Sequence, residues 1–135
     1  NEAQLTALLE HPGIVPVYDA GEDEAGRPYY TMPVVRGRTL AQAIEAADLE
    51  GRLRLVRHFI DACQAVSYAH SEGVLHRDLK PSNVMVGGFG ETLVVDWGLA
   101  VTFEVAERGV SEAGTPEYSA PEQRAGGAVP FSWLH

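Results

Sequence analysis

Two short polar segments carry the side chains that are best suited to chemistry. The first, residues 76–83, reads His-Arg-Asp-Leu-Lys-Pro-Ser-Asn, and the second, which begins at Asp96, reads Asp-Trp-Gly. Asn83 and Asp96 offer hard oxygen ligands, which suit Mg²⁺ bound together with substrate phosphates. Asp78 can reach a hydroxyl poised for in-line attack, and Lys80 can neutralise charge that builds on a transferred phosphoryl group. These residue types therefore indicate phosphoryl transfer.

Short strands must hold these two segments together. Residues 74–75 begin an extended piece before the first segment. The runs 84–86 and 92–95 flank the Gly-rich turn 87–90, and this pattern predicts a hairpin. The hairpin places two carboxylates, one amide and one ammonium near the ends of adjacent strands. The alternative interpretation is that these are only turn-favouring residues at loop ends.

The first third of the chain predicts a helix and a second hairpin. The spacing of the leucines predicts a helix over residues 2–9, which Pro12-Gly13 ends. A strand over 14–20, a polar turn over 21–27 and a returning strand over 29–35 should follow. Beyond Asp96 the chain has no clear periodicity.

Two helices are predicted between these hairpins. Thr39 and Gln42 form a capping box, which predicts a helix from about residue 40 to 47. A longer helix over 52–72 should end at Gly73 and has an apolar face wide enough to require burial on two sides. That face comprises Leu55, Phe59, Ala62, Val66 and Ala69, flanked by Val56, Ile60 and Cys63, and we expect Cys63 to be buried as a small apolar residue.

Composition and charge exclude several classes of protein. The chain has 135 residues, which fits one domain, and 45% hydrophobic with 21% charged residues is typical of a globular protein. Ten Lys and Arg against 19 Asp and Glu give a net charge of −9, which argues against nucleic acid or an anionic membrane as partner. A single cysteine and the absence of an apolar run of about 18 residues favour the cytoplasm.

The order and spacing of three motifs resemble those of a protein kinase. HRDLKPSN, DWG and Ala120-Pro121-Glu122 resemble the catalytic loop, the metal-binding motif and the end of the activation segment of eukaryotic-like Ser/Thr kinases from bacteria. The resemblance implies an α+β, protein-kinase-like two-lobe fold that is incomplete here. The end of the small lobe and the hinge would occupy residues 1–35, the first half of the large lobe 36–123, and an irregular tail 124–135.

The resemblance also implies roles for individual residues, with ATP and Mg²⁺ as cofactors. The catalytic residues would be Asp78 as base, Lys80 as its phosphate-contacting neighbour, and Asn83. Asn83 and Asp96 would ligate the metal. The remaining residues of the ATP site would be Glu2, which pairs with an ATP-anchoring lysine, Met32 behind the adenine, Pro33 and Val35 in the hinge, Ser82 and Met85.

Four residues are assigned to the control of activity and to the acceptor site. Arg77 would pair with a phosphate in the activation segment, and Ser111 is the expected phosphosite because it lies in the polar centre of that segment. Thr115 would hydrogen-bond the Asp78–Lys80 pair and help to form the floor under the acceptor hydroxyl. Glu122 ends the segment. His76 and Trp97 are expected to pack together as structural residues.

Three functions from different classes remain open. The first is an ATP-dependent Ser/Thr protein kinase that acts on protein substrates. The second is a small-molecule phosphotransferase, which Arg77, Lys80 and the GTPEYSAPE segment disfavour. The third is a truncated kinase remnant or pseudokinase that acts as a binding module. We expect the chain to be the central part of a longer kinase, because a Gly-rich loop and a lysine strand should precede Asn1 and further helices should follow. Alone, it should have negligible activity and should self-associate through its exposed apolar face.

Overall fold

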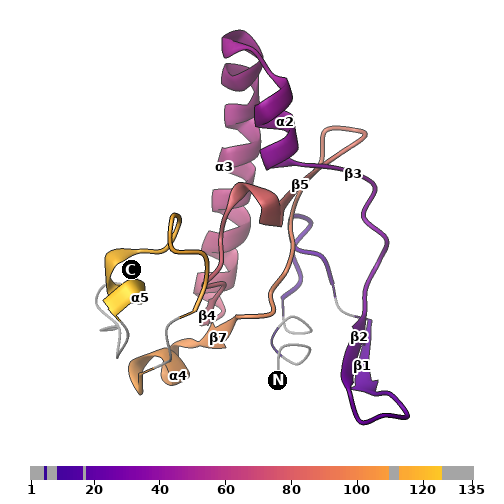
Figure 1. Cartoon of the computed structure of the whole chain (residues 1–135), viewed down its shortest axis with the longest axis vertical. Coiled ribbons are helices and arrows are strands. Elements are labelled where there is room, and N and C mark those ends of the chain that lie inside the picture. Colours follow the sequence, from indigo (N-terminus) through magenta and orange to yellow (C-terminus); the bar gives the residue numbers. More distant parts are fainter. Residues whose placement is uncertain (1–4, 6–8, 17, 110–112, 126–135) are drawn as a thin grey trace.

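The longest helix determines the shape of the molecule. The computed structural model describes residues 5, 9–16, 18–109 and 113–125. Helix α3, Leu49–Ser71, runs along the long axis, and the shorter α2, Leu40–Ala46, packs beside its first turns (Figure 1). Most of the helix predicted over residues 2–9 lies outside the described residues, although Leu5 is helical. Among the described helices, none is long and apolar enough to cross a membrane.

The capping box of α2 and the glycine that follows α3 agree with the sequence prediction, whereas the N-cap of α3 was not predicted. The Thr39 hydroxyl accepts the Gln42 backbone N–H at 3.1 Å, and the Gln42 side chain accepts the Thr39 N–H at 2.9 Å, which completes the capping box of α2. The Asp48 carboxylate caps α3 by accepting the Gly51 N–H at 2.8 Å. Gly73 follows the end of α3 with φ +74°, as predicted.

A three-stranded antiparallel sheet packs against α3. Its order is β3 (Gly37–Thr39), β5 (Val84–Gly87) and β6 (Thr92–Val94), and β5–β6 confirms the predicted hairpin. Strand β3 was not predicted, because three residues carry no pattern. It approaches β5 so closely that a Cβ on Gly37, at φ +136°, would collide with the Val86 carbonyl oxygen.

Two small antiparallel pairs complete the strands. Strands β1 (Asp19–Glu22) and β2 (Pro28–Thr31) form the predicted first hairpin, but with narrower bounds than predicted. The predicted strand over 14–20 is wrong at its start, because Ile14 instead bridges Val94 in parallel. Strand β4 (Val74–Leu75) pairs with β7 (Val101–Thr102).

The chain beyond Asp96 is more regular than the sequence indicated. Besides β7 it forms α4, Phe103–Glu107, and α5, Pro121–Ala125, both a little over one turn long. The Thr102 hydroxyl caps α4 by accepting the Val105 N–H at 3.3 Å. Elements this short depend on their packing partners, so periodicity did not predict them. The mixture of helices and antiparallel strands confirms the predicted α+β class.

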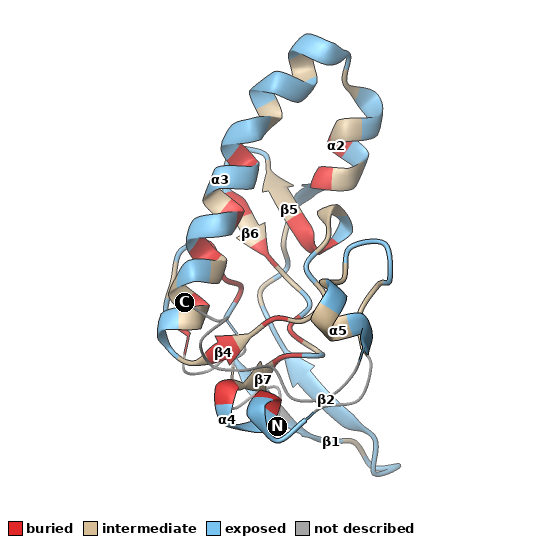
Figure 2. Cartoon of the chain, turned by 90° about the vertical axis from the view of Figure 1, so that its left-hand side faces the viewer, coloured by how far each residue is buried: buried red, intermediate tan, exposed pale blue. Residues whose placement is uncertain are grey.

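The hydrophobic core lies between α3 and the strands (Figure 2). Helix α3 contributes mainly alanines, which let its backbone come close to β6. The buried residues of this core are Leu9, Ile14, Leu40, Ala62, Ala65, Ala69, Val74, Val84, Val94, Trp97 and Ala100. His58 is also buried at this face, and its Nδ1 lies 2.7 Å from the Thr92 hydroxyl, which in turn donates to Asp61 at 2.9 Å.

The predicted apolar face of α3 is only partly buried. Ala62 and Ala69 are buried, and Leu55 and Val66 are half-buried as neighbours of the core. Phe59 is 63% exposed and Ile60 51% exposed, so the second side of the helix is uncovered. The expectation that Cys63 is buried was wrong, because it lies on this exposed side.

Candidate active site

A buried histidine holds the polar segment 76–83 in place. His76 follows β4, is 2% exposed and lies against Trp97 with 4.6 Å between ring centroids, as expected. Its Nε2 lies 3.0 Å from the Val95 carbonyl oxygen, and its Nδ1 accepts the Asp78 N–H at 3.2 Å. Burial lowers the pKa of His76, so the ring is neutral with its proton on Nε2. The imidazole therefore ties the polar loop to the end of β6.

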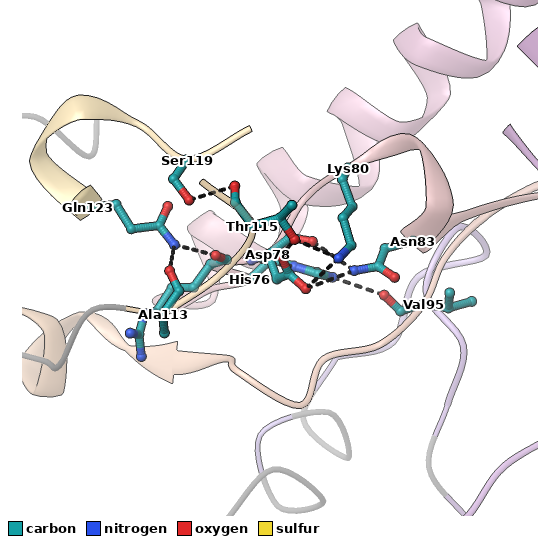
Figure 3. A network of polar contacts seen from close by, with 10 residues as sticks. His76, Asp78, Lys80, Asn83, Val95, Ala113, Thr115, Ser119 and Gln123 are labelled. Carbon is teal, nitrogen blue, oxygen red and sulfur yellow. Dashed lines mark hydrogen bonds and ion pairs between the residues drawn. The ribbon is translucent and has the colours of Figure 1, made fainter. Parts of the chain in front are cut away.

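The carboxylate of Asp78 is held by three side chains (Figure 3). Oδ1 accepts the Thr115 hydroxyl at 2.8 Å. Oδ2 lies 3.4 Å from Lys80 Nζ and accepts Asn83 Nδ2 at 3.2 Å. Burial raises the pKa of Asp78, but the Thr115 hydrogen bond, the Lys80 charge and the Asn83 amide together hold it below 3.8. Asp78 is thus ionised at neutral pH and can accept a proton.

The hydroxyl of Thr115 has one defined orientation. Lys80 Nζ donates to Thr115 Oγ1 at 2.6 Å, so the hydroxyl accepts on one side and gives its only proton to Asp78. The Lys80 side chain is 24% exposed and the Asp78 side chain 13%, so both are partly buried but still accessible to solvent. The ammonium is therefore available to an anionic group that approaches Asp78.

The hairpin β5–β6 brings the two predicted metal ligands to the same end. Val84 pairs with Val94, and the Val95 N–H donates to the Asn83 carbonyl oxygen at 2.9 Å. Asp96 follows with φ +58°, a left-handed conformation that a non-glycine residue seldom adopts, and its side chain is exposed. Asn83 is 6% exposed, and its amide nitrogen also donates to the Asp78 carbonyl oxygen at 2.8 Å.

This donor set fits a magnesium ion that is shared with a phosphate group. With its nitrogen held by Asp78, the Asn83 amide can offer its oxygen, and Asp96 can offer a carboxylate. Mg²⁺ commonly takes one or two protein ligands and completes its octahedron with phosphate oxygens and water. Among the described residues, no three His, Cys, Asp or Glu side chains gather closely enough to form a metal site by themselves.

Residues 113–125 bring Thr115 to the polar segment 76–83. The Thr115 carbonyl oxygen accepts the N–H groups of Tyr118 and Ser119 at 2.9 and 3.0 Å and the Ser119 hydroxyl at 2.9 Å. Gln123 Nε2 donates to the Ala113 carbonyl oxygen at 2.7 Å and to that of Arg77. Sequence reasoning missed Gln123, and its position directly after Ala120-Pro121-Glu122 was the only signal.

The other predicted site residues lie outside this network. Met32, Pro33 and Val35 are in the connection between β2 and β3, where Met32 is 38% exposed. Ser82, in the 3-10 turn η1 (Pro81–Asn83), is exposed, and Met85 is half-buried on β5.

Arg77 and Glu122 are the other residues assigned to the control of activity that the structure describes. Arg77, at φ +70°, directs Nη1 toward the Leu99 carbonyl oxygen at 3.5 Å, and Glu122 is half-buried at the start of α5. Glu2 and Ser111 lie outside the described residues, as does most of the tail 124–135.

Comparisons with known proteins agree on one family. The family described as the protein kinase domain matches residues 1–127. Over 111 residues, 73% of the chain, it is 50% identical to the serine/threonine-protein kinase PknD of Protochlamydia amoebophila, of which the match covers 11%. It is 40% identical to the DNA damage-responsive serine/threonine-protein kinase RqkA of Deinococcus radiodurans, over 95% of the chain and 20% of the relative. It is 38% identical to the serine/threonine-protein kinase PknB of Mycobacterium tuberculosis, over 95% and 22%.

Proposed function

The chain belongs to the protein kinase domain family, and we propose that it acts in a serine/threonine protein kinase that transfers the γ-phosphate of ATP to protein hydroxyls. The predicted kinase-like α+β fold is confirmed by this membership. The chain spans 11% to 22% of the length of the three relatives named above. The reaction, its substrates and its cofactors are therefore proposals for the natural polypeptide that contains these 135 residues.

The observation that carries the proposal is the joint contact of Thr115 with Asp78 and Lys80. An ionised Asp78 can orient an acceptor hydroxyl and take its proton as the oxygen attacks phosphorus. Lys80, 3.4 Å from that carboxylate, can stabilise the charge on the transferred phosphoryl group. Phosphoryl transfer depends chiefly on such positioning and electrostatics.

ATP and Mg²⁺ are the cofactors that we propose for this site. Bound Mg²⁺ would neutralise phosphate charge, and Asn83 and Asp96 would hold it from the end of β5–β6. Two carboxylate or amide oxygens at one hairpin end support this assignment. The proposed nucleotide-contacting residues are Glu2, Met32, Pro33, Val35, Ser82 and Met85.

A protein acceptor is favoured over a small molecule. Thr115, which contacts Asp78 directly, comes from residues 113–125, and this segment lies over the catalytic loop (Figure 3). A segment that supplies part of the acceptor site can also bind the backbone around a Ser or Thr. By the sequence resemblance, Arg77 would pair with a phosphate on Ser111, and Glu122 would anchor the end of the segment.

We propose two further properties for the 135 residues when they are isolated. They contain no Gly-rich phosphate loop of the form G-x-G-x-x-G, so transfer by them alone should be negligible. Phe59 and Ile60, more than half exposed on α3, should drive self-association.

The experiment that tests the function is phosphate transfer by the natural polypeptide that contains this chain. Labelled ATP with Mg²⁺ would be supplied, and label would be measured in the protein itself and in dephosphorylated casein. We expect phosphoserine or phosphothreonine, with loss of label in Asp78→Asn and retention in Glu45→Gln, a matched change on the exposed face of α2. Equal labelling by Asp78→Asn and the unchanged protein would contradict the proposal.

A further inference from the structure

The side chain of Gln123 joins the two segments that meet at the acceptor site. Its amide nitrogen donates to the Ala113 carbonyl oxygen at 2.7 Å and to the Arg77 carbonyl oxygen, so both N–H bonds of the amide are used. Arg77 directly precedes Asp78, and Ala113 lies two residues before Thr115. The amide therefore bridges the backbones beside the base and beside its hydroxyl partner (Figure 3).

The space around this amide leaves no room for another side chain. Gly114 lies between the two bridged segments with φ +99°. A Cβ at Gly114 would come within 2.6 Å of the Arg77 carbonyl oxygen and 2.7 Å of Gln123 Nε2. Such distances are too short for real contacts, so the glycine is required for the amide to reach both carbonyl groups. Gly114, Arg77 and Gln123 together thus form this close backbone approach.

A second set of hydrogen bonds makes the bridge stiff. The Thr115 carbonyl oxygen accepts the backbone N–H of Ser119, and the Gln123 N–H donates to the Ala120 carbonyl oxygen at 3.0 Å. The backbone of Gln123 thus follows directly on the turn that is hydrogen-bonded to Thr115, and its side chain extends from there to the Arg77 carbonyl oxygen. Displacement of the amide would move Arg77 relative to Ala113, and with them Asp78 relative to Thr115.

We propose that Gln123 is a positioning residue, which sets the distance between Asp78 and the Thr115 floor of the acceptor site by donating two hydrogen bonds. The inference rests on the proposed kinase function. Two carbonyl oxygens require two donors, and a carboxylate of the same size has none when ionised. The role of Gln123 therefore depends on its N–H donors and not only on its size. A carboxyl group at this position, which gains a donor when it is protonated, can test this dependence.

The test compares Gln123→Glu with Gln64→Glu in the natural polypeptide. Gln64 lies on the exposed face of α3, so the control has the same change of charge and size at a remote site. At about pH 7.5 we expect Gln123→Glu to lower kcat for casein phosphorylation about 10- to 100-fold, with KM for ATP changed less than about 2-fold. Gln64→Glu should match the unchanged protein.

The pH dependence gives a signature that a purely structural role would not produce. Two carbonyl oxygens raise the pKa of the introduced carboxyl group, which on protonation regains one donor. The ratio of Gln123→Glu activity to unchanged activity should therefore rise several-fold between about pH 7.5 and about pH 5.5. The corresponding ratio for Gln64→Glu should stay flat.

Hydrogen exchange provides a readout that does not depend on turnover. In Gln123→Glu the Ser119 amide should exchange about tenfold faster while amides in α3 are unchanged. Normal kcat in Gln123→Glu, a flat activity ratio, or equally faster exchange throughout α3 would each overturn the positioning role. If the unchanged protein transfers no phosphate while Asp78→Asn behaves identically, the proposed function fails and this inference fails with it.

Discussion

The Thr115 hydroxyl donates a 2.8 Å hydrogen bond to the Asp78 carboxylate, although 37 residues separate the two in the chain. Because Lys80 donates to the same hydroxyl, Thr115 cannot reverse this bond without losing a charged partner. The contact therefore keeps one carboxylate oxygen occupied and leaves Asp78 ionised. The strength of this contact depends on residues 113–125 being placed against the polar segment 76–83.

Two replacements of Thr115 should distinguish the contribution of its hydroxyl to activity from that of its methyl group. Thr115→Ala removes both hydrogen bonds and should lower kcat about 10- to 100-fold, whereas Thr115→Ser keeps the hydroxyl and should stay within about 3-fold. Steady-state phosphorylation of casein by the natural polypeptide measures both. Equal loss in the two variants would show that the methyl group, and not the hydrogen bonds, is what matters.

The low pKa of Asp78 predicts the acid side of the pH profile. Burial raises the pKa of Asp78, but the contacts with Thr115, Lys80 and Asn83 favour the ionised form and keep this pKa below the ordinary Asp value of 3.8. Activity should therefore not fall through protonation of Asp78 anywhere between about pH 7 and about pH 5. In Thr115→Ala one of these contacts is lost, and the acid limb of kcat should move to higher pH. An unmoved limb would contradict the assignment of Asp78 as base.

Stability should fall below about pH 6.5 because of buried histidines. Burial lowers the pKa of His76 and His70 in the folded protein, and burial with the nearby Arg57 charge lowers that of His58. Between the folded and unfolded pKa values the unfolded chain binds more protons, so the free energy of unfolding rises with pH in that window. It should be greatest above the ordinary value of 6.5 and decline as pH falls below it.

Urea unfolding of the isolated chain measures this dependence. His76→Gln should reduce the slope of unfolding free energy against pH below about 6.5 without abolishing it, since His58 and His70 remain. A variant with the full original slope would mean that His76 is not held neutral by the fold.

Asp96 should govern the magnesium-dependent part of nucleotide affinity. Asp96→Asn removes a charged oxygen ligand, so MgATP affinity should fall about tenfold or more, while ATP affinity in the presence of a chelator should be nearly unchanged. Calorimetric titration of the natural polypeptide gives both values, and Glu45→Gln serves as the control for charge. Loss of affinity under both conditions would argue that Asp96 supports the fold and not the metal.

The exposed side of α3 should determine the association state of the isolated chain. Phe59→Glu places a charge where an apolar side chain is 63% exposed, and the monomer fraction in sedimentation should rise. Ala25→Glu adds a negative charge in the exposed turn between β1 and β2, away from α3, and should leave association unchanged. Equal effects of both variants would indicate that net charge alone controls association.

The sequence predicted the parts of the site that depend on local chemistry. The capping box at Thr39, the β5–β6 hairpin and the joint position of Asp78, Lys80 and Asn83 follow from turn and cap residues or from motif spacing. The burial of α3 was predicted less well, because Ala65 and His58 are buried and Phe59 is not. The spacing of apolar residues predicts which face of a helix is apolar, but it does not predict which neighbouring element covers that face.

Two contacts between residues far apart in the chain could not be predicted for the same reason. The bridge from Ile14 to Val94 and the reach of Gln123 to Arg77 join residues that no local pattern relates. Three-residue β3 and two-residue β7 are stabilised by their partners and have no propensity of their own to detect.

The left-handed backbone at Arg77 and Asp96 has a consequence for which residues evolution should keep at these two positions. A non-glycine residue in that conformation costs on the order of 1 kcal/mol, which glycine would recover. If the proposed phosphate transfer is under selection, the side chains at both positions should be retained against this cost. In a gene copy released from that selection, stability alone should favour glycine at position 96, because glycine adopts the left-handed conformation without this cost.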